Sequence, residues 1–188
     1  MDADDDRSLI LSVLSGRTEA FEPLVARYQG LVAGVGWKLG VPRAEIEDLV
    51  SDVFVKAYRS LEAYNPEFPF TSWLYRIAVN ASLDVLRRGR EARRTDELPD
   101  DLAAKAPGPG DELAMGRRAA RLRSALATLP ERDRVPLVLL YLESRTVAEI
   151  AAILRLSEGA VKTRLHRARA RLEDVIRSRF SDLIEDTP

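Results

Sequence analysis

An acidic, proline-containing segment near the middle of the chain, residues 96–116, constrains the fold more than any other feature. It carries Pro99, Pro107 and Pro109 among clustered acids, with 6 acidic side chains against 1 basic one. Such a composition is typical of a self-repelling, flexible linker, because it buries too little apolar surface to order itself. We therefore expect two domains on a tether. The alternative is a long surface loop inside one domain, although structureless loops beyond about 12–15 residues are uncommon there.

Both flanking blocks show apolar residues at helical spacing and no strand-type alternation. Before the linker, the spacing predicts helices over about 8–14, 21–35, 42–61 and 71–89, with the prolines of 65–70 ending the third. After it, Pro130 should end one helix, and Pro136 should kink or delay the next. The predicted fold class is all-α: a helical domain over 1–95, an acidic linker over 96–116, a second helical domain over 117–178 and a short tail over 179–188.

The formal net charge of −1 conceals segregated charge. Residues 1–95 carry a net −1, residues 96–116 a net −5 and residues 117–188 a net +5. With no Cys and one His, the chain lacks the ligands of a typical zinc site, and its acids are scattered, so we expect no metal, no cofactor and no enzymatic activity. No stretch approaches the length of a membrane span, and residues 1–20 show no signal pattern, so we expect a cytoplasmic protein without membrane insertion.

Residues 146–172 carry the most informative pattern. Thr146 and Glu149 form a capping-box pattern, and Ser157 is a second N-cap candidate, which together predict a helix, a three-residue turn and a second helix. Apolar residues at 161, 165, 168 and 172 would bury one side of that second helix. The opposite side then exposes basic residues: within 155–171, six of them accompany only Glu158. This layout is typical of a helix-turn-helix that enters the DNA major groove, and a merely solvated basic face is the alternative.

The N-terminal block offers a different chemistry around the loop at 65–70. Aromatic residues Phe68, Phe70, Trp73 and Tyr75 precede a helix whose residues 76–94 carry a net +4. Aromatic rings beside cations can hold unstacked bases of a single strand, while Arg binds the backbone. The alternative is that these rings simply form the core.

Taken together, the motifs resemble the extracytoplasmic-function (ECF, group IV) sigma factors of bacterial RNA polymerase. The resemblance covers nearly the whole chain. Its carriers, in chain order, are EDLVSDVFVKAY at 47–58, FTSWLYRIAVN at 70–80 with Asp84 and Arg87-Arg88, LPER at 129–132, and residues 149–151 with 161–169. Each motif alone is weak, but their order around an acidic linker is specific.

The resemblance implies a role for each segment. Residues 1–95 would form the sigma-2 helical bundle and residues 117–178 the sigma-4 helix-turn-helix domain. Core polymerase would be bound through the clamp helices of its largest subunit and the flap of its second largest, the clamp contacts falling on Asp48, Asp52, Phe54 and Lys56. The linker would thread the active-centre cleft and the RNA exit path, where its charge is similar to that of RNA.

Promoter DNA would be read at two places. The melted minus-ten element, with one base flipped out, would contact Phe70, Trp73, Arg76, Asn80, Arg87 and Arg88. The duplex minus-thirty-five element would contact Lys162, Thr163, His166, Arg167 and Arg169; His166 is not expected to bind metal, because zinc needs several ligands.

The implied function is that of a non-enzymatic sigma factor that directs core RNA polymerase to promoters and assists melting, with an inhibitory anti-sigma factor as a further partner. The alternative is a one-component regulator whose N-terminal domain binds a ligand or dimerises. The chain departs from the family pattern at Ser144 and Val147, where Gly and an aromatic are usual, and at Lys162 and Thr163, where Arg and Ser are frequent. Promoter sequence is therefore not carried over.

Overall fold

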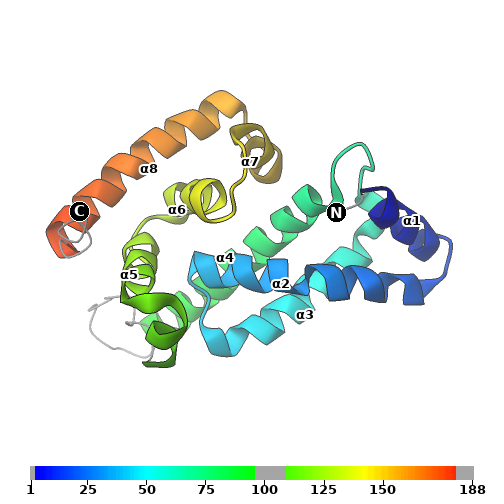
Figure 1. Ribbon diagram of the computed structural model, residues 1–188, viewed down its shortest axis with the longest axis horizontal. Coiled ribbons are helices and arrows are strands. Elements are labelled where there is room, and N and C mark those ends of the chain that lie inside the picture. The colour runs from blue at the N-terminus through cyan, green and yellow to red at the C-terminus, as the bar shows by residue number, and fades with distance from the viewer. Residues whose placement is uncertain (1–2, 96–108, 181–188) are drawn as a thin grey trace.

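The computed structural model describes residues 3–95 and 109–180, and every regular element within them is helical (Figure 1). This confirms the all-α fold class. The elements before the gap are α1 (Ala3–Leu14), η1 (Thr18–Phe21), α2 (Glu22–Leu39), η2 (Arg43–Glu45), α3 (Ile46–Arg59), η3 (Leu61–Ala63) and α4 (Phe70–Thr95). Those after it are α5 (Pro109–Ala127), α6 (Glu131–Leu137), η4 (Val138–Leu142), α7 (Val147–Leu154) and α8 (Glu158–Arg179).

Helices α2, α3 and α4 pack against one another, with α1 at one end of the bundle (Figure 1). Because apolar residues recur every three or four positions, each helix presents a stripe to the common core. Its buried residues include Leu24, Tyr28, Val32, Val35, Leu49, Val53, Leu74 and Ala78. Gly36 lies where α2 meets α3 so closely that a Cβ there would collide with the Leu49 side chain.

A buried carboxylate fastens α1 to this bundle. Asp6, 7% exposed, accepts hydrogen bonds from the Tyr28 hydroxyl and from Arg27, both on α2. Asp5 adds an exposed ion pair to the same guanidinium. Burial and the hydrogen bond with Asp6 raise the pKa of Tyr28 far above its usual value, so the phenol stays protonated as a donor. This polar anchor lies outside the apolar pattern and lets α1 begin at Ala3, not near Ser8 as the spacing predicted.

The second unit places α5, α6 and α7 along α8. Its core is built from residues of all these helices: Ala125, Leu126, Leu129, Val135, Leu139, Ile150, Val161, Leu165 and Ala168. Pro136 lies inside α6, and the chain widens directly after it into the π-helical turn η4. The distortion predicted near Pro136 is therefore a π-helical turn that begins at Val138, the first residue after α6.

Two boundaries differ from the sequence-based expectation. Helix α4 continues to Thr95, beyond the expected end near Gly89. Residues 109–116, assigned to the linker by charge, begin α5, whose helical geometry breaks at Gly116 (φ 73°). Proline is well tolerated in the first turn of a helix, so Pro109 starts one where we read only a linker. The rest of the expected linker, 96–108, and residues 181–188 lie outside the described residues.

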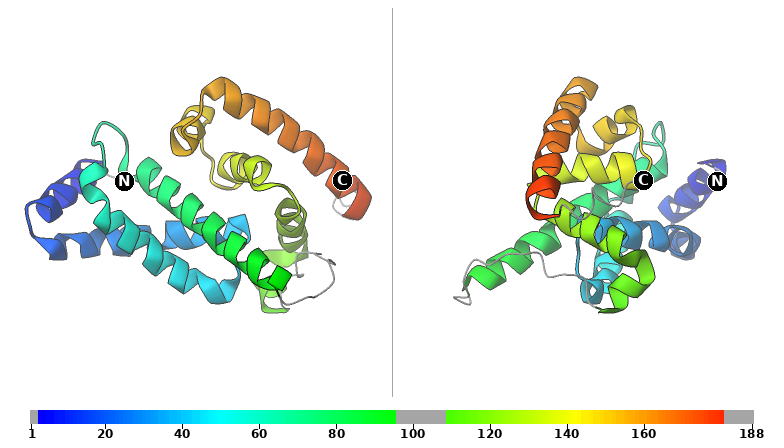
Figure 2. Two further views of the ribbon diagram at one scale, coloured as in Figure 1. Left: turned by 180° about the vertical axis from the view of Figure 1, so that it is seen from behind. Right: turned by 60° about the vertical axis from the view of Figure 1, so that its left-hand side comes forward.

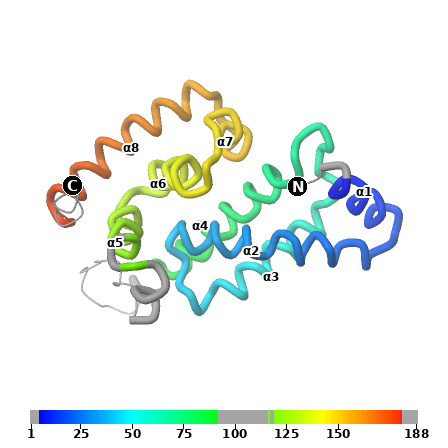
Figure 3. Tube along the Cα trace, in the orientation of Figure 1, coloured from blue at the N-terminus to red at the C-terminus, as the bar shows by residue number. Residues whose placement is uncertain are grey.

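The two units lie against each other in this structure. Helix α4 contacts α7, while α2 contacts α5 and η4. Both the rear view in Figure 2 and the Cα trace in Figure 3 show α6 and α7 lying beside α4. The predicted minus-ten face of α4 is therefore adjacent to the helix-turn-helix.

Candidate nucleic-acid interfaces

Two N-caps fix the helix-turn-helix geometry. The Thr146 hydroxyl accepts from the Glu149 N–H at 3.2 Å, and the Glu149 carboxylate accepts in return from the Thr146 N–H at 2.8 Å. The hydrogen bond from the Thr146 backbone is the main cause that holds the pKa of Glu149 below its usual value. Ser157 caps α8 by accepting from the Ala160 N–H at 3.2 Å. Between them, Arg155 takes a left-handed conformation (φ 54°) and ends α7.

Helix α8 has one buried side and one basic exposed side. Val161, Leu165 and Ala168 are buried against α6 and α7. The five residues expected at the minus-thirty-five element are all exposed: Lys162, Thr163, His166, Arg167 and Arg169. The structure thus brings the whole predicted set onto one helix and away from its apolar stripe.

Neighbouring groups orient parts of this exposed face. Arg169 donates to the Tyr141 hydroxyl at 2.8 Å, and its guanidinium lies 5.6 Å from the centre of that ring. The Thr163 hydroxyl donates to the Gly159 carbonyl at 2.9 Å, while Lys162 lies 3.9 Å from Glu158 in a loose ion pair. Tyr141, in η4, is 58% exposed and was not singled out from the sequence, because it lies within an apolar run that gives no sign of its exposure.

The loop before α4 is held by local hydrogen bonds. The Tyr64 hydroxyl donates to the Phe68 carbonyl at 2.6 Å, and the Asn65 side chain accepts from the Glu67 N–H at 3.0 Å. Phe70 and Trp73 are buried, 3% and 7% exposed. Both rings pack against Tyr64, with centroids 5.6–5.7 Å away. These two aromatics therefore form the floor of the loop more than a free surface.

A pocket of about 320 Å³ opens beside these rings. On the α4 side it is lined by Tyr64, Phe68, Trp73 and Arg76, among others, and on the opposite side by α7 and its end, at Ala152 and Arg155. A neighbouring pocket of about 270 Å³ lies between Arg76 and Asn80 on α4 and residues 153–155. Partial burial, together with the nearby Arg155 charge, lowers the pKa of Arg76. Of the four residues expected to hold a flipped base, Trp73 and Arg76 line the first pocket, and Arg76 and Asn80 line the second. Phe70 lines neither pocket and lies buried beneath Trp73 and Tyr64.

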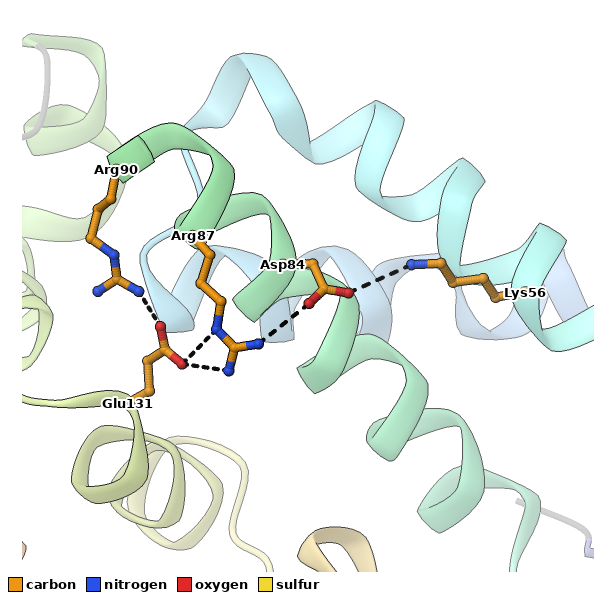
Figure 4. A network of polar contacts seen from close by, with 5 residues as sticks. All are labelled: Lys56, Asp84, Arg87, Arg90 and Glu131. Carbon is orange, nitrogen blue, oxygen red and sulfur yellow. Dashed lines mark hydrogen bonds and ion pairs between the residues drawn. The ribbon is translucent and has the colours of Figure 1, made fainter. Parts of the chain in front are cut away.

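The remaining minus-ten candidates, Arg87 and Arg88, lie exposed further along α4. Arg87 donates to Glu131 on α6 at 2.9 Å through Nη2 and 3.2 Å through Nε, and Arg90 also binds Glu131 (Figure 4). Asp84 lies 3.6 Å from Arg87 and 4.0 Å from Lys56 on α3. Although burial acts to raise it, hydrogen bonds from Arg87 and Arg90 leave the pKa of Glu131 below its usual value.

Of the residues expected to bind core polymerase, three lie on the protein surface and one is buried in the hydrophobic interior. Asp48, Asp52 and Lys56 are exposed on α3. Phe54 is 5% exposed and packs edge-on against Phe21, with ring centroids 6.3 Å apart. Phe54 therefore supports this surface from beneath. Two apolar side chains of the same helix that the sequence reading did not select, Val55 and Tyr58, are 47% and 42% exposed.

The described residues contain no group of three His, Asp or Glu side chains placed to hold a metal ion. Within residues 3–95 and 109–180, no helix has the length and apolar character required to cross a bilayer.

Two family models match the two units described above. Sigma-70 region 2 matches residues 24–92, and Sigma-70, region 4 matches residues 119–172. The class of protein is therefore that of the sigma-70-type specificity subunits of RNA polymerase.

Relatives specify the class further. The chain is 35% identical to RNA polymerase sigma factor CnrH of Cupriavidus metallidurans over 181 residues, which is 92% of this chain and 95% of the relative. It is 34% identical to the ECF RNA polymerase sigma-E factor of Haemophilus influenzae, over 91% of this chain and 95% of the relative. The chain belongs to the ECF sigma factors, and so directs RNA polymerase to promoters.

Solved structures agree in fold. CnrH in complex with the cytosolic domain of CnrY has a TM-score of 0.68 at 32% identity, covering 95% of this chain and 99% of that one. The sigma factor RpoE in complex with the anti-sigma factor NepR from Bartonella quintana has a TM-score of 0.63 at 24% identity, covering 85% and 98%. The latter likeness shows the fold alone.

Proposed function

We propose that the chain reads promoters with two separate surfaces and opens them without any catalytic group. The exposed donors of α8 read the minus-thirty-five duplex. The pocket beside Trp73 takes a base flipped from the melted minus-ten element, with Arg76 at its edge and Asn80 in the neighbouring pocket that Arg76 also lines. The observation that carries this proposal is the segregation on α8, where every predicted donor is exposed on the side opposite the buried stripe.

Strand capture explains how melting proceeds without ATP. Flipping a base out of the stack costs a few kcal/mol, and a preformed pocket for the flipped base recovers that cost only in the opened state. Aromatic rings that stack on bases contribute about 1–3 kcal/mol each in single-strand binding. The aromatic floor and the cationic rim of this pocket supply both kinds of contact.

The exposed face of α3 contributes the core-polymerase contact. Asp48, Asp52 and Lys56 are exposed toward the clamp helices of the largest subunit. Val55 and Tyr58 add apolar area that Phe54 supports from below. The flap of the second largest subunit is the expected contact of the C-terminal domain. A protein with these contacts would act in the cytoplasm, where bacterial RNA polymerase acts.

An anti-sigma factor is a further proposed partner, since CnrH, the relative with 32% identity among the solved structures, is in complex with another protein, the cytosolic domain of CnrY. The one-component regulator is the less favoured function, because sigma-70 region 2 accounts for residues 24–92, where a ligand-binding or dimerisation domain would have to lie. We assign residues 1–95 to the sigma-2 domain and 117–178 to the sigma-4 domain, with α5 beginning inside the linker.

The minus-thirty-five surface is tested with Lys162→Ala and Arg167→Ala. The probe is a duplex selected from a randomised promoter library by the wild-type protein bound to core polymerase. Each variant should lose about 1–3 kcal/mol of duplex affinity, measured by fluorescence anisotropy, because a donor to a base edge or phosphate is removed. Core binding, measured by co-purification, should not change.

The matched control is Arg177→Ala, which removes the same kind of charge from the exposed end of the same helix, where Arg177 pairs with Glu173 at 2.6 Å. It should retain most of the affinity. Equal losses of duplex affinity in all three variants would indicate a nonspecific effect of charge. Loss of core-polymerase binding would contradict the domain assignment.

The minus-ten surface is tested with Asn80→Ala, since Asn80 is exposed and lines the pocket next to the one beside Trp73. The variant should form open complexes more slowly on a closed promoter than the wild type, by about tenfold if one charge-neutral hydrogen bond to the flipped base is lost. On a premelted template the defect should be smaller, because no stacking has to be broken there. Equal defects in open-complex formation on both templates would contradict a role of Asn80 in capturing the flipped base.

A further inference from the structure

Tyr141 of η4 lies against Arg169 of α8, the last of the five residues expected at the minus-thirty-five element. Arg169 Nε donates to the Tyr141 hydroxyl at 2.8 Å, and the guanidinium carbon lies 5.6 Å from the centre of the ring. Both side chains are exposed, and the exposed fraction of Tyr141 is 58%. The inference drawn from this contact rests on the proposed reading of duplex DNA by α8.

A π-helical turn presents Tyr141 to solvent. Pro136 has no N–H and cannot continue the hydrogen-bond ladder of α6, and the chain widens after it into η4. The Glu143 N–H donates to the Val138 carbonyl, five residues back, at 3.1 Å. All five residues of η4 are apolar or aromatic, and of these only Tyr141 is exposed. Such turns are rare and occur frequently at functional sites, so this exposed ring is a candidate for a function.

The segment formed by α6 and η4 binds two arginines of α8, and the two contacts differ in charge. Arg171 binds the Asp133 carboxylate, whose side chain is 3% exposed, so the charge of Arg171 is compensated within the domain. Arg169 instead meets a neutral hydroxyl and an aromatic ring, and within the part of the chain that the structure describes it makes no ion pair. Arg171 therefore anchors α8 on α6 (Figure 1), while Arg169 is held in place with its charge uncompensated.

The pair formed by Tyr141 and Arg169 has hydrogen-bond donors to spare. A guanidinium carries five N–H donors, and Arg169 uses the one on Nε to bind Tyr141. The Tyr141 hydroxyl accepts that bond and keeps its own hydrogen, for which the described residues supply no acceptor. A cationic donor on the hydroxyl oxygen also polarises the O–H group and makes it a stronger donor. The pair is therefore suited to an anionic acceptor.

The position of the pair along α8 indicates which anion this is. Helix-turn-helix proteins contact base edges with the N-terminal residues of the recognition helix. Arg169 lies seven residues after Lys162, about 10.5 Å further along the helix at roughly 1.5 Å per residue. Donors outside the base-reading end bind phosphates, which fix the register of a protein on the duplex. The acceptor that fits this pair is a backbone phosphate of the minus-thirty-five duplex.

We propose that Tyr141 is a positioning residue of the minus-thirty-five surface: it holds the Arg169 guanidinium beside one backbone phosphate of the duplex and donates its own hydroxyl hydrogen to that phosphate. Because the ring and the hydroxyl restrict the Arg169 side chain before DNA arrives, less rotamer freedom is lost on binding. The contact carries no base preference, and it fixes how α8 lies in the major groove.

The test uses the full chain bound to core polymerase and the same selected duplex that tests Lys162 and Arg167. Tyr141→Phe keeps the ring and removes only the hydroxyl, so duplex affinity should fall about five- to tenfold, measured by fluorescence anisotropy. Arg169→Ala should lower the affinity by about tenfold or more, because it removes a charged donor to the same phosphate.

Duplexes with single methylphosphonates, in which one backbone phosphate is neutral, give a readout that a merely structural role would not change. At one position the losses caused by Tyr141→Phe and by Arg169→Ala should both shrink to less than about twofold, because the shared acceptor has lost its charge. At the other positions both losses should persist. The control is Arg177→Ala, where Arg177 pairs with Glu173 near the end of α8, and its small effect should not depend on the position of the methylphosphonate.

Unchanged duplex affinity in Tyr141→Phe, with a loss in Lys162→Ala, would overturn the role of Tyr141 and leave the reading of the duplex by α8 intact. An equal loss in Tyr141→Phe on every probe would overturn it too, because the hydroxyl would then only support the fold. Loss of core-polymerase binding in this variant would show that the pair faces a protein acceptor and not DNA. Unchanged affinity in Lys162→Ala as well would instead contradict the proposed function of α8.

Discussion

Ser144 is the residue at which a departure from the family pattern meets a backbone constraint. Its φ is 52°, in the left-handed region, and it lies directly before Arg145 and the capping box of α7. A side chain in that conformation costs roughly 1–2 kcal/mol, which explains why Gly is usual at this position in the family.

Ser144→Gly should therefore stabilise the protein. The relief of about 1–2 kcal/mol exceeds the roughly 0.4–1 kcal/mol that Gly adds to the entropy of the unfolded chain, leaving a net gain of about 0.5–1 kcal/mol. Urea unfolding followed by circular dichroism measures it. Ala152→Gly, at an exposed position in the interior of α7, is the control and should lose about 1 kcal/mol. A loss at both positions would show that Ser144 is unstrained.

Single buried charges were the residues that sequence reasoning missed. Asp133 is 2% exposed and binds Arg171 of α8, and Arg134 beside it is buried as well. Both lie in a Glu-Arg-Asp-Arg run that resembles an exposed helix start. Asp133 is buried where α6 packs against α8, and Arg134 lies near Gly40 at the end of α2 and Ala127 of α5. No local pattern encodes either packing.

At the scale of elements, α2 and α3 pack closely at Gly36, where a Cβ would meet Leu49 Cδ2 and lie 3.3 Å from Ile46 Cδ1. Gly34, two residues earlier in the same helix, has nothing within 4 Å of its would-be Cβ. The pair therefore separates helix propensity from helix packing.

Gly34→Ala should raise the free energy of unfolding by about 0.5–1 kcal/mol, because Ala favours a helix over Gly. Gly36→Ala gains the same propensity but should lose about 1 kcal/mol net, since overpacking a filled interface costs about 1–3 kcal/mol. Thermal and urea unfolding of both variants give the comparison. Stabilisation by both would show that Leu49 moves aside freely and that the close approach is not required.

Element boundaries were predictable where side chains bind the backbone locally. Thr146, Glu149 and Ser157 cap α7 and α8 at the expected positions, because capping depends on residues three apart. Boundaries set by distant contacts were not: α1 reaches Ala3 alongside the contacts of Asp5 and Asp6 with Arg27, more than twenty residues away. The burial of Phe54, by contrast, followed from the apolar stripe of α3, although the family resemblance had suggested a surface role.

At the scale of the whole molecule, charge by segment predicted two helical units but not how they meet. The contacts between them join residues 105, 68 and 44 positions apart: Lys38 with Glu143, Tyr75 with Glu143, and Arg87 with Glu131. No periodicity links such positions. Glu131 and Glu143 also belong to a segment of net charge +5, in which the sequence analysis counted them only as charges that offset part of the basic excess.

The position of Arg87 has a consequence for how such a protein evolves. Its guanidinium binds Glu131 of α6 and, as proposed, the DNA backbone, so its replacement alters the contact between the two units and promoter binding together. The Glu143 carboxylate accepts from Lys38 and Tyr75, and the family resemblance assigns neither to the minus-ten element. Substitution at Glu143 can therefore change how the units meet while the residues assigned to the promoter stay fixed, whereas Arg87 ties the two traits to one codon.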